Sequence, residues 1–248
     1  MRFAIGSSPH IATTETVSSV MRRVLYGMLP GIAALVWFFG WGVIINILIA
    51  TAAALSFEAV MLLARGRPRG PFLTDYSVIV TAWLLGASLP PLAPWWLTVI
   101  GTGFAVIVAK HLYGGLGYNP FNPAMVGYVV LLISFPLEMS TWLPARGPGD
   151  YLLGPLETLN VILSGQLPLG LTFDAISGAT PLDRVRTGLT LDRSIGAIMA
   201  EGPFGWLAGA GWEWVNLAFL AGGIWLIRTH TADWRIPAAM LGTLGGMA

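Results

Sequence analysis

A largely apolar run of 41 residues, from 24 to 64, contains a single charged side chain, Glu58, and strongly constrains how this chain folds. A helix of about 20 apolar residues crosses the hydrocarbon core of a bilayer. The run therefore predicts two membrane-spanning helices rather than one. We place the break at Phe38-Phe39-Gly40-Trp41, because aromatic side chains suit the membrane interface and glycine permits a tight turn.

The composition agrees with a membrane protein and narrows the chemistry. Hydrophobic residues make up 55% of the 248 residues and charged residues 10%, whereas soluble domains carry about 25% charged residues. The chain has no Cys, which excludes thiolate-bound iron–sulfur clusters, zinc–thiolate sites and disulfides within it. The three His are well separated, which disfavours haem, and no basic cluster indicates nucleic-acid binding. Redox chemistry here therefore requires an organic cofactor.

Further apolar segments predict an all-α polytopic membrane protein of about six to seven spans. The segment 77–89 is short, covering roughly 20 Å of a core about 30 Å thick. The chain stops inside its last apolar segment, so we expect it to be cut short. The remaining segments are 95–113, a short run that ends at Phe135, 204–227 and 236–248.

Proline and glycine interrupt two of these spans at membrane depth. Asn122-Pro123 predicts an N-cap followed by a first-turn proline, so the next helix presents a positive dipole end. Broken helices line ligand sites in transporters, and they also occur where kinked helices pack; both interpretations stay open here. Thr74-Asp75 before the short span predicts an N-cap rather than a site.

The distribution of basic residues predicts the orientation. With the N-terminus in the cytoplasm, nine of the 13 basic residues fall on the cytoplasmic side, and the other four lie in the 68-residue stretch 136–203. Long loops are largely exempt from the positive-inside rule, so this stretch is predicted to be periplasmic. The nine are Arg2, Arg22, Arg23, Arg65, Arg67, Arg69, Lys110, Arg228 and Arg235.

The chain is thus predicted to have four parts, with the N-terminus in the cytoplasm. Residues 1–23 lack the pattern of a cleaved signal peptide and are interpreted as a cytoplasmic arm. Residues 24–135 form a first membrane bundle with short or broken helices. Residues 136–203 form the periplasmic loop, and residues 204–248 contain a further span and the start of the next.

The periplasmic loop contains the sequence DAISGATPLD at residues 174–183. Pro181 biases Thr180 toward an extended backbone, and Gly178 and Ala179 add little bulk. The result is an accessible hydroxyl that a modifying enzyme can reach. On local sequence alone, an ordinary turn is the simpler interpretation.

Five blocks of sequence together resemble one family along the whole chain. The chain is similar to the D subunit of the Rnf electron-transport complex, also called the ion-translocating oxidoreductase complex. It also resembles the related B subunit of the sodium-pumping NADH:quinone reductase, which remains the alternative. The blocks are LPGIAALVWFFGWG (29–42), LPPLAPWW (89–96), KHLYGGLGYNPFNPAMVGYVVLLISFP (110–136), DAISGATPLD (174–183) and AGAGWEWVNLAFLAGG (208–223).

The resemblance implies a covalent flavin. In this family the pattern D-x-x-S-G-A-T is where a flavin transferase joins FMN to Thr through a phosphoester bond. The pattern falls on Asp174, Ser177, Gly178, Ala179 and Thr180 without mismatch. A phosphate there keeps a negative charge. Nearby Arg184 and Arg186 offer positive charge to offset it, although solvated loop charges are the simpler interpretation of both.

The resemblance also implies the wider assembly. It implies a second, non-covalent flavin, riboflavin, among the helices, and a urea-transporter-like fold of two inverted repeats. Iron–sulfur and flavin centres lie in partner subunits, and the complex couples electron transfer between NADH and ferredoxin to Na⁺ or H⁺ movement. A non-redox channel or transporter is the alternative class, but it gives no reason for the D-x-x-S-G-A-T pattern.

Two carboxylates fall inside predicted spans and are candidates for the ion path. Glu213 is placed near the middle of the span 204–227, and Glu58 in the inner part of the second span. An ionisable group at the bilayer centre costs about 2.5–3.5 kcal/mol or more. The simpler interpretations are a hydrogen-bonded packing residue for Glu213 and a side chain that snorkels to the interface for Glu58.

Overall fold

The structure is a computed structural model that describes residues 15–147, 153–168, 170, 172, 177–178, 181–201, 204–205 and 209–246. Within these residues the regular elements are helices, and one isolated bridge pairs Phe204 with Gly209. The predicted all-α membrane fold is therefore confirmed. Three described helical segments are long and apolar enough to cross a bilayer, and α6 (Pro123–Ser134) is apolar but shorter. The three are α1 (Val17–Phe39), α2 (Gly42–Ala64) and Trp95–Leu112.

The first two spans separate at the predicted place. α1 ends at Phe39, Gly40 turns the chain with φ of +86°, and α2 begins at Gly42. The start of α1 differs from the prediction. The helix begins at Val17 because Thr16 and Ser19 form a capping box, so the expected arm 1–23 includes the first turns of α1.

An arginine-rich link leads to the short span. α3 (Arg69–Leu73) follows α2, and α4 (Ser77–Ser88) follows α3. The predicted N-cap at Thr74-Asp75 is wrong, because Tyr76 occupies the N-cap position of α4 and makes no side-chain capping hydrogen bond. Asp75 Oδ1 still accepts a hydrogen bond from the Ser77 backbone N–H at 2.8 Å. Thr74 does not cap α4, because its hydroxyl donates to the Gly70 carbonyl at 2.9 Å.

The next span changes its helical winding along its length. α5 (Trp95–Gly103) continues into η1 (Phe104–Leu112), which is a π-helix. A loop then leads to α6, and Asn122 Oδ1 accepts a hydrogen bond from the Ala124 backbone N–H at 2.9 Å. The predicted N-cap with Pro123 in the first turn is therefore confirmed.

The C-terminal half alternates short helices with links. The described part of the predicted loop 136–203 contains helices of five to ten residues. The span expected at 204–227 begins only at Trp212, because Gly211, with φ of +86°, precedes the helix. The helices are α7 (Pro136–Ser140), α8 (Pro155–Ser164), α10 (Pro181–Thr190), α11 (Ile195–Glu201), α12 (Trp212–Arg228) and α13 (Arg235–Gly246).

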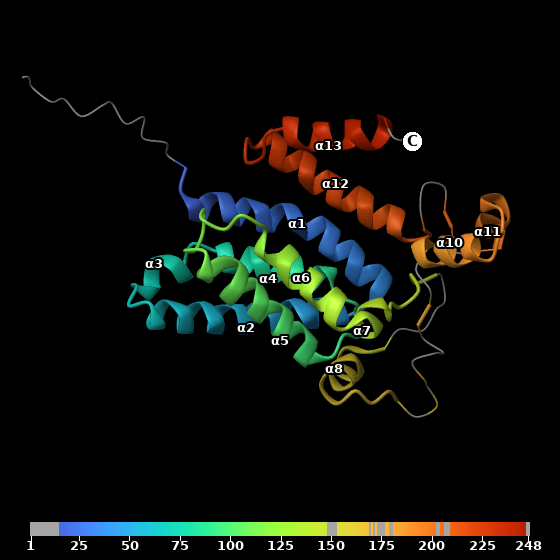
Figure 1. Cartoon of the computed structure of the whole chain (residues 1–248), viewed down its shortest axis with the longest axis horizontal. Coiled ribbons are helices and arrows are strands. Elements are labelled where there is room, and N and C mark those ends of the chain that lie inside the picture. The colour runs from blue at the N-terminus through green and yellow to red at the C-terminus, as the bar shows by residue number, and fades with distance from the viewer. Residues whose placement is uncertain are drawn as a thin grey trace, which may run out of the picture.

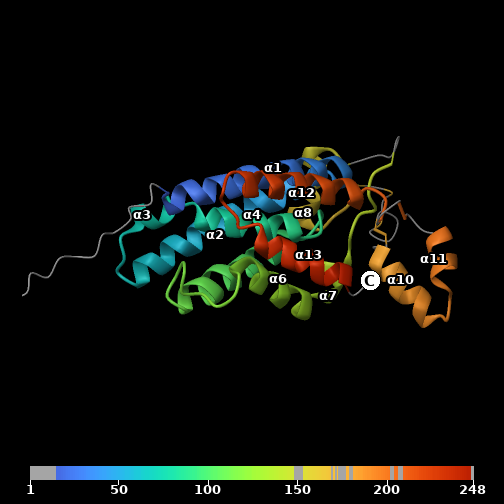
Figure 2. The same ribbon diagram turned by 90° about the horizontal axis from the view of Figure 1, so that it is seen from above.

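The spans pack as a helical bundle along the long axis of the molecule. α2 packs against α4, α5 and η1, and α1 packs against α12 (Figures 1 and 2). Small residues bring α1 and α12 together, since a side chain on Gly222 would collide with the Gly27 carbonyl. One cluster of buried apolar side chains joins α1, α2 and α12 and includes Phe39, Val43 and Val215.

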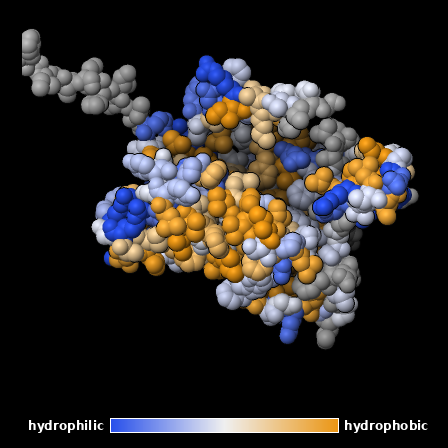
Figure 3. All heavy atoms as spheres, in the orientation of Figure 1, coloured by the Kyte–Doolittle hydropathy of each residue, from blue (hydrophilic) through white to orange (hydrophobic). Residues whose placement is uncertain are grey.

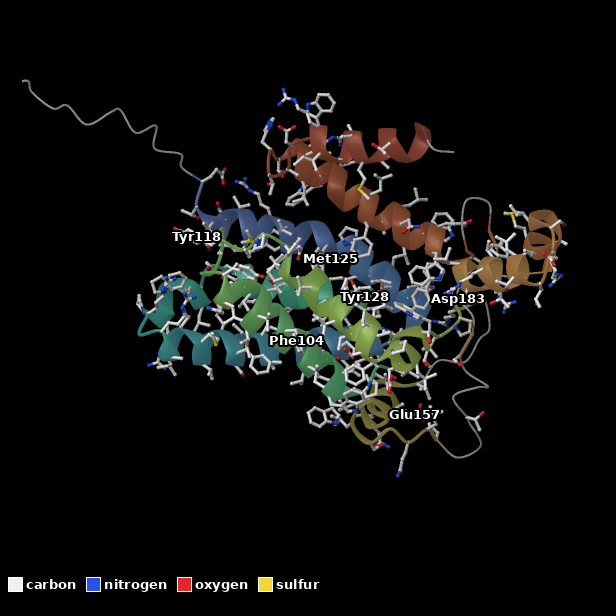
Figure 4. The ribbon with its side chains drawn as sticks, viewed as in Figure 1. Phe104, Tyr118, Met125, Tyr128, Glu157 and Asp183 are labelled. Atoms are coloured by element: carbon white, nitrogen blue, oxygen red, sulfur yellow. The ribbon has the colours of Figure 1, made fainter. Side chains whose placement is uncertain are left out.

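The two ends of the bundle differ. α3 lies at one end, and α10 and α11 lie at the other (Figure 1). Apolar side chains cover the middle of the face in Figure 3, and hydrophilic ones lie around its rim, at both the α3 end and the α10–α11 end. Tyr118 and Asp183 mark the two opposite ends in Figure 4. The predicted topology assigns residues 65–69 and 136–203 to different sides of the membrane, so it requires α3 and α10 to lie at opposite ends of the bundle.

We predict that Gly222→Ala destabilises the chain and that Gly223→Ala does not. The added methyl group at 222 meets the Gly27 backbone, whereas nothing lies within 4 Å of it at 223. Overpacking costs about 1–3 kcal/mol, while alanine alone favours a helix by up to about 1 kcal/mol over glycine. Thermal unfolding of the purified full chain measures both. Equal midpoints for the two variants would contradict the close α1–α12 contact.

We predict that Arg69 faces the cytoplasm and Gln166 the periplasm. Both positions are exposed and the chain has no Cys, so Arg69→Cys and Gln166→Cys each introduce one reactive thiol. A membrane-impermeant maleimide should label position 166 from the periplasmic side, and position 69 only after the inner membrane is opened. The reverse pattern would overturn the orientation.

Candidate functional site

An aromatic cluster ties together the end of the bundle that bears the D-x-x-S-G-A-T segment. The rings of Phe39, Trp142 and Trp212 lie 4.6–5.9 Å apart, joining the end of α1, the link after α7 and the start of α12. The Gly178 backbone N–H donates a hydrogen bond to the Trp142 carbonyl at 2.9 Å. The aromatic cluster therefore fixes where Gly178 lies.

A cavity of about 770 Å³ opens beside this segment. Five described parts of the chain line it: the link between α4 and α5, helix α7 with the residue after it, the end of α8, residues 177–178, and helix α10. Ser177 and Gly178 belong to the wall, so the segment singled out by sequence borders the cavity. The other lining residues are Leu92, Ala93, Pro94, Leu137, Glu138, Ser140, Thr141, Gly165, Asp183 and Thr187.

The structure places part of the predicted flavin site. Ser177 and Gly178 are described, whereas Asp174, Ala179 and Thr180 lie outside the described residues. Arg184 and Arg186 are both exposed on α10, and the described wall of the cavity includes neither. Asp183, one residue before Arg184, lines the cavity from the first turn of α10 (Figure 4).

A buried charge cluster lies toward the opposite end of the bundle, where α2 meets η1. Glu58 is only 1% exposed. Its Oε1 accepts a hydrogen bond from Lys110 Nζ, and its Oε2 lies beside His111 Nε2, both at 2.9 Å. The interpretation that Glu58 snorkels to the interface is therefore wrong. Lys110 is also buried, so it does not count as a loop charge in the predicted topology.

The π-helix explains why two consecutive side chains meet one carboxylate. Neighbouring residues on an α-helix point about 100° apart and do not face the same partner. The wider winding of η1 brings Lys110 and His111 together onto Glu58, and Arg65 ties the turn by donating to the His111 carbonyl at 2.8 Å. The sequence contained a signal, a Lys-His pair in an apolar segment, but the periodicity of an α-helix hides the contact.

Glu213 lies away from the expected place. It is in the first turn of α12 rather than at mid-membrane, and it is 3% exposed. Its carboxylate packs against Gly205, where any side chain would collide with it. A helix N-terminus favours negative charge, so the position itself stabilises the carboxylate. Its part in ion movement stays a prediction.

Comparison with known proteins fits this arrangement. A sequence model of the NQR2, RnfD, RnfE family matches residues 4–248. The chain belongs to the NQR2, RnfD, RnfE family. The resemblance indicated by the five sequence blocks is thereby confirmed.

Several relatives resemble the chain along nearly all of its length. The D subunit of the ion-translocating oxidoreductase complex from Escherichia fergusonii is 50% identical, over 98% of this chain and 72% of that protein. The D subunit of the same name from Alcanivorax borkumensis is 51% identical, over 99% of this chain and 70% of that protein. The counterpart from Shigella dysenteriae serotype 1 is 49% identical, over 98% of this chain and 72% of that protein.

We predict that Lys110→Met destabilises the chain more than the double variant Glu58→Gln/Lys110→Met. Removing one partner of a buried ion pair costs about 3–5 kcal/mol, because a charge is left uncompensated. The double variant removes both charges, and the amide introduced at position 58 can still bond to His111. Arg228→Met is the control, since Arg228 is exposed. Thermal unfolding of the full chain decides, and a double variant less stable than Lys110→Met would contradict the buried pairing.

Proposed function

We propose that this chain is a membrane subunit of a redox-driven ion pump that carries FMN on Thr180 through a phosphoester bond. The observation that carries the proposal is the complete D-x-x-S-G-A-T pattern at residues 174–180, whose described members Ser177 and Gly178 border a cavity. The relatives are named as the D subunit of an ion-translocating oxidoreductase complex, which supports the redox and transport classes.

The cavity suits a flavin ring in size and chemistry. Ligand sites typically enclose about 300–1,000 Å³ and combine apolar walls with a few polar groups. Here Leu92, Pro94 and Leu137 supply apolar surface, and Thr141 and Thr187 supply hydroxyls that can donate or accept hydrogen bonds. These residues would hold the ring while Thr180 holds the phosphate.

The start of α10 suits the phosphate. Thr180 directly precedes Pro181, where α10 begins. Backbone N–H groups and the helix dipole at a helix N-terminus favour an anion. Arg184 and Arg186, on the first two turns of α10, add positive charge on the same short helix. Attachment at Thr180 therefore places the phosphate where this chain offsets negative charge.

When bound, FMN supplies the ability to take two electrons together and release them one at a time. The chain's own residues position the group. The aromatic cluster of Phe39, Trp142 and Trp212 holds Gly178, and Gly178 in turn fixes the chain close to Thr180.

The wider proposal follows the family. The complex would pass electrons between NADH and ferredoxin through partner subunits that hold iron–sulfur and flavin centres. It would couple this transfer to movement of Na⁺ or H⁺ across the bacterial inner membrane, with the flavin segment in the periplasm. A flavin transferase would attach the FMN, and a riboflavin would bind among the helices.

We predict that Thr180→Ala removes the covalent flavin without unfolding the chain, because a single loop hydroxyl contributes little to stability. Thr180→Ser keeps a nucleophilic hydroxyl and should retain some modification. The matched control is Thr190→Ala on α10, whose exposed hydroxyl donates to the Thr187 carbonyl at 2.7 Å. Each variant is co-expressed with the transferase.

Fluorescence of the denatured band under ultraviolet light and the mass of the intact chain give the result. The native chain and Thr190→Ala should carry one FMN, and Thr180→Ala none. A native chain without the adduct would end the proposal and favour a non-redox transporter. An adduct that persists in Thr180→Ala would move the attachment to another residue.

A further inference from the structure

The buried charge cluster continues to the surface through a chain of side-chain hydrogen bonds. Ser77 Oγ, at the start of α4, accepts from Lys110 Nζ at 3.1 Å and donates to Asp75 Oδ1 at 2.7 Å. Ser77, Lys110, Glu58 and His111 are all buried, whereas Asp75 is partly exposed. One unbroken line of polar contacts thus runs from the surface to the inside of the bundle.

The inner end of this line has a free position. His111 Nε2 faces Glu58, and Nδ1 is buried with no hydrogen-bond partner among the described residues. Buried polar atoms are almost always hydrogen-bonded, so an orphaned ring nitrogen marks the place of a water or a further proton carrier. Imidazole is the side chain best suited to pass a proton from one nitrogen to the other near neutral pH.

We propose that a proton relay carries protons from the surface at the α3 end into the interior of the bundle. Its members are Asp75, Ser77, Lys110, Glu58 and His111. The ion exchanged along this part of the chain is therefore H⁺. The free energy that would drive net proton movement comes from the redox cycle, so that part rests on the proposed function. The path itself depends only on these five side chains.

The contacts favour a proton over a metal cation. Hard cations require a cage of several oxygen ligands. Both oxygens of Glu58 already face nitrogens, and the described residues contain no cluster of His, Asp and Glu able to hold a metal ion. Arg65 adds a further positive charge by bonding to the His111 carbonyl. A cation at Glu58 would have to displace Lys110.

The proton transfers balance along the line. Lys110 gives a proton to Glu58, which breaks an N–H bond, forms an O–H bond and leaves a neutral amine beside a neutral acid. Ser77 then passes its hydroxyl proton to Lys110 and receives one from protonated Asp75. The net result moves one proton from Asp75 to Glu58, and solvent reprotonates Asp75. With His111 neutral and its own proton on Nδ1, Glu58 next gives its proton to Nε2 while Nδ1 passes its proton to a water at the free position, which leaves Glu58 ionised and His111 neutral.

Neutralisation inside the bundle is physically accessible. Burial removes solvation from both charges, and this loss raises the free energy of the charged pair relative to the neutral acid and amine. Lys110 and Glu58 are both nearly inaccessible to solvent. The pair therefore suits a group that changes its protonation without large movement of the helices.

The test uses the intact complex in sealed vesicles, with protons moved and electrons transferred measured together in sodium-free medium. Ser77→Ala breaks the line but leaves every charge in place, and Ser77→Thr restores the hydroxyl. Thr81→Val is the matched control on α4, because the buried Thr81 hydroxyl donates to the Ser77 backbone carbonyl and stands outside the line. FMN content is read from the fluorescent band of each variant.

The number of protons moved per electron transferred should fall in Ser77→Ala and stay at the native value in Ser77→Thr and Thr81→Val. The FMN band should be unchanged in all three variants. Undiminished proton movement in Ser77→Ala, or native vesicles that move charge only when Na⁺ is present, would overturn the relay. A native complex that shows no fluorescent FMN band would instead contradict the proposed function. The two proposals therefore fail in different measurements.

A second measurement does not depend on electron transfer. Infrared difference spectra of the full chain between acid and alkaline pH report carboxylic-acid C=O bands. A band in the native chain that shifts in Glu58→Asp and vanishes in Glu58→Gln is expected. A Glu58 that stays ionised at every pH tested would overturn the relay even if the variants pump poorly.

Discussion

The pairing of Glu58 with Lys110 and His111 is the interaction around which the first bundle is organised. Charges inside an apolar bundle are costly unless they are paired and hydrogen-bonded. The requirement that both nitrogens reach one carboxylate fixes the register of α2 against η1 and agrees with the π-helical winding of η1. Ser77 then ties α4 to the same point. Three helices are thus held by contacts that apolar packing alone would not specify.

The two proposed sites lie toward opposite ends of the bundle, and this separation limits how they can be coupled. The cavity beside Ser177 and Gly178 is lined in part by α10, and the charge cluster joins α2, η1 and the start of α4. Figure 1 shows α10 and α3 at opposite ends of the bundle. A cofactor at one end and an ion-loading relay at the other would be joined only through packed helices. In such an arrangement, coupling requires that one element adopt two states to which both sites respond.

Features with a local signal could be predicted from the sequence, whereas features that depend on packing could not. The break at Gly40, the N-cap at Asn122 and the all-α membrane class follow from turn, cap and span patterns. The start of α12 was misplaced because the apolar residues 204–211 continue the hydropathy pattern of the helix, whereas α12 begins at Trp212. The buried cluster was missed because the distribution of basic residues assigned Lys110 to the cytoplasmic side, whereas Lys110 is buried. The Thr180 site was recognisable only through the family pattern, since a Gly-Ala-Thr-Pro stretch has no distinctive local physics.

A cofactor-resolved density map of the intact complex purified from native membranes tests the central claim most directly. We expect density continuous from the Thr180 side chain into a phosphate at the start of α10. A flavin ring should follow in the cavity lined by Leu92, Leu137 and Thr187. A Thr180 side chain that ends without further density, or a flavin joined to another residue, would contradict the claim.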